Sequence, residues 1–132
     1  MSQTQPDSIA ASCFEPSRQV DGIPEVIDIS YDLQALRISL TFADREEPVH
    51  ATFHESRGFR VLDEGDLTEF WNPETRPDGW LWRISAGGWL DLERTRPAFI
   101  TGLGDQYMEF LVLGVDDCVS IIASAEPVLD LS

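Results

Sequence analysis

Apolar and polar residues alternate with a period of two along much of this chain, which is the pattern of half-buried β-strands. The alternation is clearest in residues 36–42, where Leu36, Ile38, Leu40 and Phe42 are separated by polar side chains. Residues 107–113 and 118–123 are more continuously apolar, as expected of buried strands joined in a hairpin. The strands that this pattern predicts are residues 26–29, 36–42, 49–54, 59–62, 80–84, 89–92, 107–113 and 118–123.

One short segment has helical spacing instead. Leu67, Phe70 and Trp71 fall on one face of a helix over residues 64–71, and Asp63 suits its N-cap. The predicted fold class is therefore α+β, a mainly antiparallel, meander-like β-sheet with one short helix near residues 64–71. The predicted core comprises Leu36, Ile38, Leu40, Phe42, Leu67, Phe70, Phe110, Val112, Val119 and Ile121.

The first 24 residues follow neither period and hold three of the eight prolines. We expect residues 1–24 to form a loosely ordered N-terminal arm and residues 25–132 to form a single globular domain. The N-terminus lacks the charged and apolar regions of a secretory signal, and no apolar run approaches the roughly 20 residues that span a bilayer. These properties predict a cytoplasmic protein in which Cys13 and Cys118 are free thiols.

The charge of the chain narrows the range of partners. It has 24 Asp and Glu residues against nine basic residues, all of them Arg, and a formal net charge of −15 at pH 7. A hydrophobic content of 42% is too high for a disordered acidic tail, so the charge belongs to a folded surface. Such a surface repels nucleic acid and anionic lipid and attracts basic surfaces. We expect a basic protein partner, and neither nucleic acid nor a membrane.

Motifs for catalysis and cofactors carry little signal. His50 and His54 lie four residues apart in a predicted strand, about 13 Å, which is too far to share a metal ion. Gly102 and Gly104 lack the third glycine and the lysine of a phosphate loop. We predict no cofactor, no metal site and no enzymatic activity. Two alternatives are a small hydrolase using a carboxylate pair beside tryptophans, and an accessory or scaffold protein.

Residues 55–82 combine seven acids with large aromatic residues that include Phe70, Trp71, Trp80 and Trp82. Aromatic anchors are favoured at the centres of interfaces, and acidic flanks steer a basic partner towards them. In the alternative interpretation, the tryptophans pack a core and the acids form a solvated face. The predicted partner-binding residues are Asp63, Glu64, Asp66, Glu69, Trp71, Trp80 and Trp82.

Three stretches carry a resemblance to a known class of protein: GFRVLDEGDL at 58–67, GGWL at 87–90 and EFLVLGVDDCV at 109–119, with Pro127 beyond them. Together they resemble small acidic bacterial immunity proteins of toxin–immunity systems, over residues 58–127. The resemblance implies a protein that neutralises a cognate toxin by binding it, and the predicted cytoplasmic location implies a toxin that acts inside the cell. Because such proteins bind through different surfaces, it assigns no functional residue.

Overall fold

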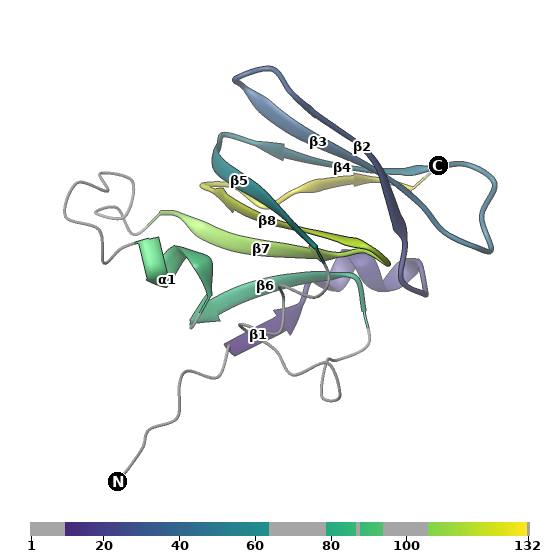
Figure 1. The fold of residues 1–132 in the computed structure, drawn as a ribbon, viewed down its shortest axis with the longest axis horizontal. Helices are drawn as coiled ribbons and strands as arrows, with labels where there is room; N and C mark the ends of the chain where they lie inside the picture. The colour runs from purple at the N-terminus through teal and green to yellow at the C-terminus, as the bar shows by residue number, and fades with distance from the viewer. Residues whose placement is uncertain (1–9, 64–78, 87, 94–105, 132) are drawn as a thin grey trace, which may run out of the picture.

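The computed structural model, which describes residues 10–63, 79–86, 88–93 and 106–131, is a sandwich of two antiparallel β-sheets (Figure 1). Sheet A has the strand order β1-β6-β7-β8-β5, and sheet B has the order β2-β3-β4-β9. The strands of sheet A are β1 (Ala10–Cys13), β5 (Ser56–Asp63), β6 (Leu81–Ala86), β7 (Met108–Leu113) and β8 (Asp117–Ala123). Those of sheet B are β2 (Glu25–Tyr31), β3 (Ala35–Thr41), β4 (Val49–His54) and β9 (Val128–Asp130). A 3₁₀ helix, η1 (Glu15–Gln19), follows β1, and a short α-helix, α1 (Trp89–Glu93), follows β6.

One apolar core lies between the two sheets. In sheet B, alternate residues of β3 and β4 point inward, and Leu36, Ile38 and Phe53 are completely buried. Sheet A contributes Phe110 and Ile121, among others, to the same cluster. Burying a large apolar side chain contributes about 1.5–3 kcal/mol, so these layers supply most of the driving force for folding. The predicted core is confirmed for Leu36, Ile38, Leu40, Phe42, Phe110, Val112, Val119 and Ile121, whereas Leu67 and Phe70 lie outside the described residues.

Sheet A is also apolar on its outer face. Trp82, Ile84, Leu111, Leu113 and Cys118 form a second buried cluster there. A strand that is buried on both faces reads as a continuous apolar run rather than an alternating one. This explains the run of apolar residues along β7.

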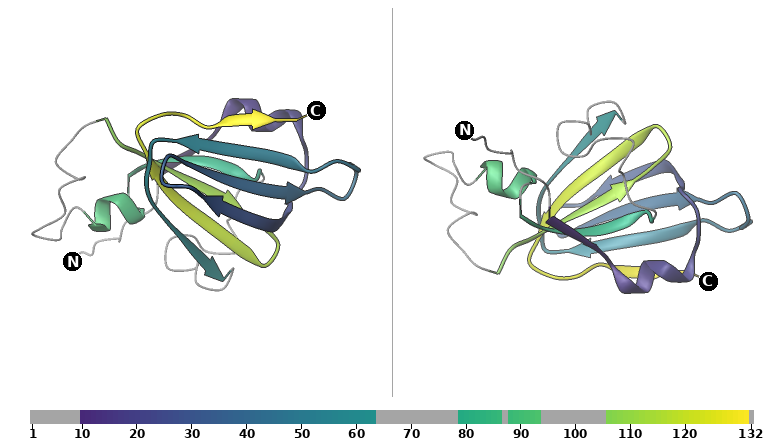
Figure 2. Two further views of the ribbon diagram at one scale, coloured as in Figure 1. Left: turned by 90° about the horizontal axis from the view of Figure 1, so that it is seen from above. Right: turned by 90° about the horizontal axis from the view of Figure 1, so that it is seen from below.

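The fold is mainly antiparallel β-structure with one short helix among the described residues, as predicted, but the strands do not form a single meander. β2-β3-β4 and β6-β7-β8 are each consecutive, whereas β1, β5 and β9 pair with strands distant in the sequence. Figure 2 shows that β2 and β5 lie along one side of the sandwich and that β9 and η1 lie along the other. The helix predicted for residues 64–71 falls outside the described part of the chain.

The expectation of a loose N-terminal arm over residues 1–24 is wrong for residues 10–24. β1 pairs with β6, and Phe14 and Val20 join the core between the sheets. The pairing partner of Cys13 is Trp82, which local sequence patterns cannot reveal. Residues 1–9 lie outside the described residues. The segment after Pro127 also belongs to the fold, because it contains β9, which pairs with β4.

The predicted strand at residues 89–92 is wrong as well, because Trp89–Glu93 forms α1. Both oxygens of the Glu109 carboxylate, from β7, accept hydrogen bonds from main-chain N–H groups at the start of this helix. The donors are Trp89 (3.0 Å) and Leu90 (2.8 Å). A Cβ at Gly88 would lie 2.7 Å from a Glu109 oxygen, so only glycine allows this approach. A long-range contact thus decides the local structure.

The turn between β2 and β3 places an apolar residue in a strained position. Leu33 is 81% exposed and has φ +76°, in the left-handed region that disfavours side chains with a Cβ. The turn is held by Asp32, whose Oδ1 accepts hydrogen bonds from the main-chain N–H groups of Gln34 and Ala35, both at 2.9 Å. These hydrogen bonds lower the pKa of Asp32.

We therefore expect Leu33→Asn to stabilise the protein by about 1 kcal/mol, because asparagine tolerates the left-handed conformation better than leucine. The measurement is the urea midpoint at an unchanged denaturant slope. As a control, Val128→Asn removes an exposed apolar side chain from β9 and should lower the midpoint, because asparagine is a poor strand residue. A lower midpoint for Leu33→Asn would contradict this account of the turn.

Candidate functional site

The residues predicted to bind a partner fall into two groups. Glu64, Asp66, Glu69 and Trp71 lie outside the described residues, and Asp63 is the last residue of β5. The remaining two, Trp80 and Trp82, are both buried, but in different places. Trp80 is 1% exposed in the core between the sheets, and Trp82 is 8% exposed in the outer cluster of sheet A. Neither ring therefore projects from the surface of the molecule.

The charge of the described residues concentrates at one end of the sandwich, seen at the right in Figure 1. The end is formed by the η1–β2 loop, the first residue of β2, the β3–β4 turn and the β7–β8 turn. Val115 N–H donates to the carbonyl oxygen of Pro24 (2.9 Å), which joins two of these segments. We call this surface the acidic end, and define it by seven exposed carboxylates: Asp21, Glu25, Asp44, Glu46, Glu47, Asp116 and Asp117.

Few cations oppose these carboxylates within the described part of the chain. Arg45 lies in the β3–β4 turn, and its guanidinium donates to the main-chain oxygen of Leu131. One ion pair forms between described residues, with Arg18 Nε 3.6 Å from Glu15 Oε2. An excess of like charge on one face produces a potential that extends into solvent and attracts oppositely charged surfaces.

Two half-exposed apolar residues border the acidic end. Ile27, at a bulge in β2, is 51% exposed, and Val115, in the β7–β8 turn, is 49% exposed. Acidic residues lie close to both in the sequence, with Glu25 and Asp28 near Ile27 and Asp116 directly after Val115. Apolar contacts enclosed by charge are the usual composition of a protein interface, with the apolar part excluding water and the charges at the rim.

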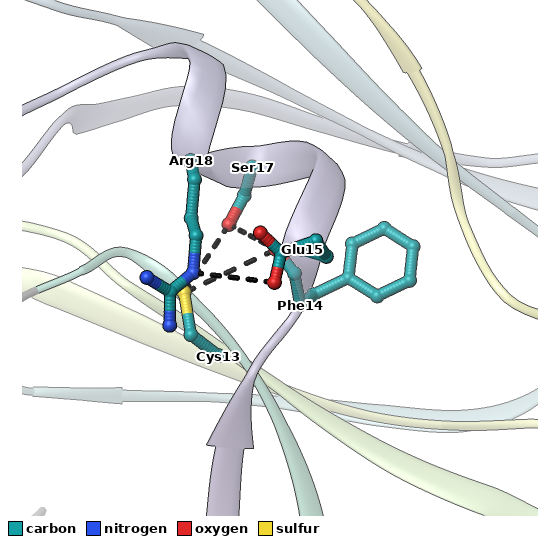
Figure 3. A network of polar contacts seen from close by, with 5 residues as sticks. All are labelled: Cys13, Phe14, Glu15, Ser17 and Arg18. Atoms are coloured by element: carbon teal, nitrogen blue, oxygen red, sulfur yellow. Dashed lines mark hydrogen bonds and ion pairs between the residues drawn. The ribbon is translucent and has the colours of Figure 1, made fainter.

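A pocket of about 330 Å³ opens beside the acidic end, between η1, the η1–β2 loop and the residues that precede β6. Figure 3 shows the polar contacts around its η1 wall. The hydroxyl of Ser17 donates to the carbonyl oxygen of Phe14 (2.7 Å), and the Cys13 sulfur lies 3.7 Å from the same hydroxyl. Arg18 turns back towards Glu15. Cys13 is half-buried and Cys118 is fully buried, and both are free thiols.

The best geometric case for a hydrolase is the buried carboxylate Glu109, beside Asp91 and Trp89. Burial raises the pKa of Glu109 above its ordinary 4.5, against the lowering effect of the N–H groups of Leu90 and Trp89 and of the Arg60 charge. Both of its oxygens already accept main-chain hydrogen bonds, and the residue is 4% exposed. Its geometry is therefore that of a helix anchor rather than of an acid that meets a substrate.

A serine–histidine contact lies on the outer face of sheet B. Ser39 Oγ is 2.9 Å from His50 Nδ1, on paired positions of β3 and β4. Ser39 is only 8% exposed, so this pair serves cross-strand packing better than nucleophilic attack. His54 lies on the same strand, but it is exposed and takes no part in this contact. Within the described ranges, no group of three or more His, Cys, Asp or Glu side chains could hold a metal ion.

No protein-family model, curated protein or solved structure matches this chain. Among the described residues, no helix has the length and apolar character to cross a membrane. The acidic end was missed from the sequence because its carboxylates come from four separate segments. Two of these, the charged turns at residues 43–48 and 114–117, were visible, but only the fold brings them together.

The buried carboxylate gives a pH-dependent prediction. Because the pKa of Glu109 is raised in the folded state, the folded protein binds its proton more tightly than the unfolded chain. Its contribution to the free energy of unfolding should therefore be greatest below pH 4.5 and fall as the pH rises through its raised pKa. In Glu109→Gln this dependence should disappear. Urea unfolding of both proteins across this range tests it, and a wild-type-minus-variant difference that increases with pH would contradict it.

Proposed function

We propose that this protein is an acidic protein-binding module, and that it acts as an immunity-type inhibitor by covering a basic surface of a toxin inside the cell. The observation that carries the proposal is the acidic end, where seven exposed carboxylates adjoin two half-exposed apolar residues. The resemblance of residues 58–127 to bacterial immunity proteins points in the same direction. The alternatives are a small hydrolase and an accessory protein.

The acidic end supports protein binding over the hydrolase on chemical grounds. A hydrolase needs converging polar groups that a substrate can reach. The two arrangements that come nearest to this, at Glu109 and at Ser39, are both buried and committed to structural contacts. An inhibitor needs only a surface complementary in charge and shape to its target, and loops at one end of a sandwich provide such a surface.

The acidic end and the predicted segment 55–82 are not exclusive. Asp63 is paired with Asp117, so the end of β5 leads into the neighbourhood of the β7–β8 turn. Glu64, Asp66, Glu69 and Trp71 follow directly in the sequence. The proposal that they contribute acids and an aromatic anchor to the same interface stays a prediction.

The first experiment is a pull-down from native cell extract, with the captured protein identified by mass spectrometry and then purified. We expect a basic protein, encoded beside the gene of this chain, whose expression alone arrests growth and whose effect is cancelled by co-expression of this chain. Recovery of no specific protein, or co-expression without rescue, would contradict the proposed function.

The second experiment measures binding kinetics with that purified protein. Replacing Asp116 and Asp117 by Lys should slow association about tenfold at low salt, because steering depends on the charge that faces the partner. The wild-type association rate should also fall as salt shortens the Debye length from roughly 10 Å at 0.1 M to about 3 Å at 1 M. Dissociation should change less.

The matched control makes the same change of charge at the opposite end of the sandwich. Glu55, which lies between β4 and β5, and Glu126, which follows β8, are both exposed there. Glu55→Lys together with Glu126→Lys exchanges two carboxylates for two ammonium groups, as the first pair does, and should leave most of the association rate intact. Equal slowing by both pairs would show that net charge alone, and not the acidic end, governs encounter. Association unaffected by salt would show that the acidity serves solubility.

A further inference from the structure

The pocket beside the acidic end has a rigid floor. Trp80 lies beneath it, 1% exposed, with its ring against Phe42 at a centroid distance of 5.3 Å. Its indole N–H donates to two carbonyl oxygens, those of Ser17 (3.1 Å) and Val20 (3.2 Å). These bonds fix η1 and the loop after it relative to the core. A pocket whose wall and floor are tied together in this way is formed before any ligand arrives, which lowers the entropic cost of binding.

Two glycines line the pocket. Gly79 has φ +119°, and a Cβ on it would lie 3.0 Å from the Trp82 ring and 3.4 Å from the Cys13 sulfur. Gly22 has φ +97°, and a Cβ on it would meet nothing within 4 Å. Both positions therefore favour glycine because of the backbone, and both leave bare main chain along the pocket. With about 330 Å³, the space is at the lower end of the range of ligand sites.

One acidic and one basic residue line the pocket. Asp21 and Arg18 both border it, but Arg18 is already paired with Glu15 at 3.6 Å. Asp21 is exposed and adds to the negative field of the acidic end. A cation entering from the partner side therefore meets the Asp21 carboxylate at the mouth, above a floor to which the largely buried Val20 and Trp80 contribute. A side chain with an aliphatic stem and a charged head fits this division.

From this geometry we infer that the pocket receives an arginine side chain of the basic partner, with its methylene groups on the floor and its guanidinium at the Asp21 carboxylate. Arginine suits the site because its planar fork bonds a carboxylate at two points and is more weakly hydrated than lysine. The inference rests on the proposed function and names the anchor of that interface. Anchors of this kind, seated in preformed pockets, carry a large share of binding energy.

Cys13 supplies an intrinsic reporter for occupancy. Its sulfur borders the pocket and is half-buried, whereas Cys118 is completely buried and serves as the unreactive internal reference. Alkylation of Cys13 by iodoacetamide, followed by peptide mass spectrometry, should slow at least about tenfold when the purified partner is bound. Conversely, wild-type protein treated first with N-ethylmaleimide should lose affinity because the adduct fills the pocket. Cys13→Ser treated in the same way should still bind.

Substitutions at the mouth test the sign of the charge that enters. Asp21→Asn should weaken partner binding about tenfold, since it removes the carboxylate that meets the guanidinium. The matched control Asp44→Asn makes the same change on another loop of the acidic end and should weaken binding about twofold or less. Arg18→Gln should tighten binding, because it removes a like charge from the mouth. Both altered residues near the pocket are exposed, so folding should be unaffected.

The outcomes separate this inference from the proposed function. If the partner binds with the expected salt dependence but Cys13 reacts at its free rate, the pocket is empty in the complex and the inference is overturned alone. Equal effects of Asp21→Asn and Asp44→Asn would overturn it too, since the carboxylate at the pocket would then have no special role. Weaker binding by Arg18→Gln with tighter binding by Asp21→Asn would mean that an anion enters. If wild-type protein binds no basic partner, both proposals fail.

Discussion

The indole N–H of Trp80 connects the core between the sheets to the segment that contains η1 and the loop carrying Asp21. One donor is shared between the carbonyl oxygens of Ser17 and Val20, while the ring is enclosed by the core. A buried indole N–H without an acceptor would be costly, so the segment from η1 to β2 has to stay where it is. Without this bond, β1 would still pair with β6, but the loop carrying Asp21 would lose its fixed position. The shape of the acidic end depends on that loop.

Charge imposes the second constraint. A protein with 24 carboxylates must place nearly all of them in water, because a buried carboxylate needs compensating hydrogen bonds. Among the described residues Glu109 is the buried exception, and two main-chain N–H groups supply that compensation. Most of the other described carboxylates occupy strand ends and turns. Repulsion among them favours segments that are held by other means. At the acidic end those means are the Trp80 bonds and the bond between Val115 and Pro24.

The strands could be predicted wherever one face is buried and the other is solvated, because burial then imposes a period of two. β3 and β4 follow this rule closely, and their boundaries were predicted to within a residue. The errors at β1, α1 and β9 have one common cause. Each of these elements is determined by a distant partner: Trp82 for Cys13, Glu109 for Trp89, and His50 for Asp130. The acidic end shares this property, since no single segment contains it. The predicted site at residues 63–82 relied on local density of acids and aromatics, a signal that cannot distinguish Trp80 in a core from a tryptophan on a surface.

The pairing of β9 with β4 has a consequence for synthesis of the chain. Residue 130 pairs with residue 50, so sheet B is completed only after residues 51–130 have been synthesised. Until then, β4 presents an unpaired edge of main-chain donors and acceptors, and such edges pair readily with other chains. Non-local pairings of this kind also slow folding, because the entropy of closing a long loop must be overcome first. A molecule that lacks β9 would therefore be exposed to aggregation through β4, even when the other strands are present.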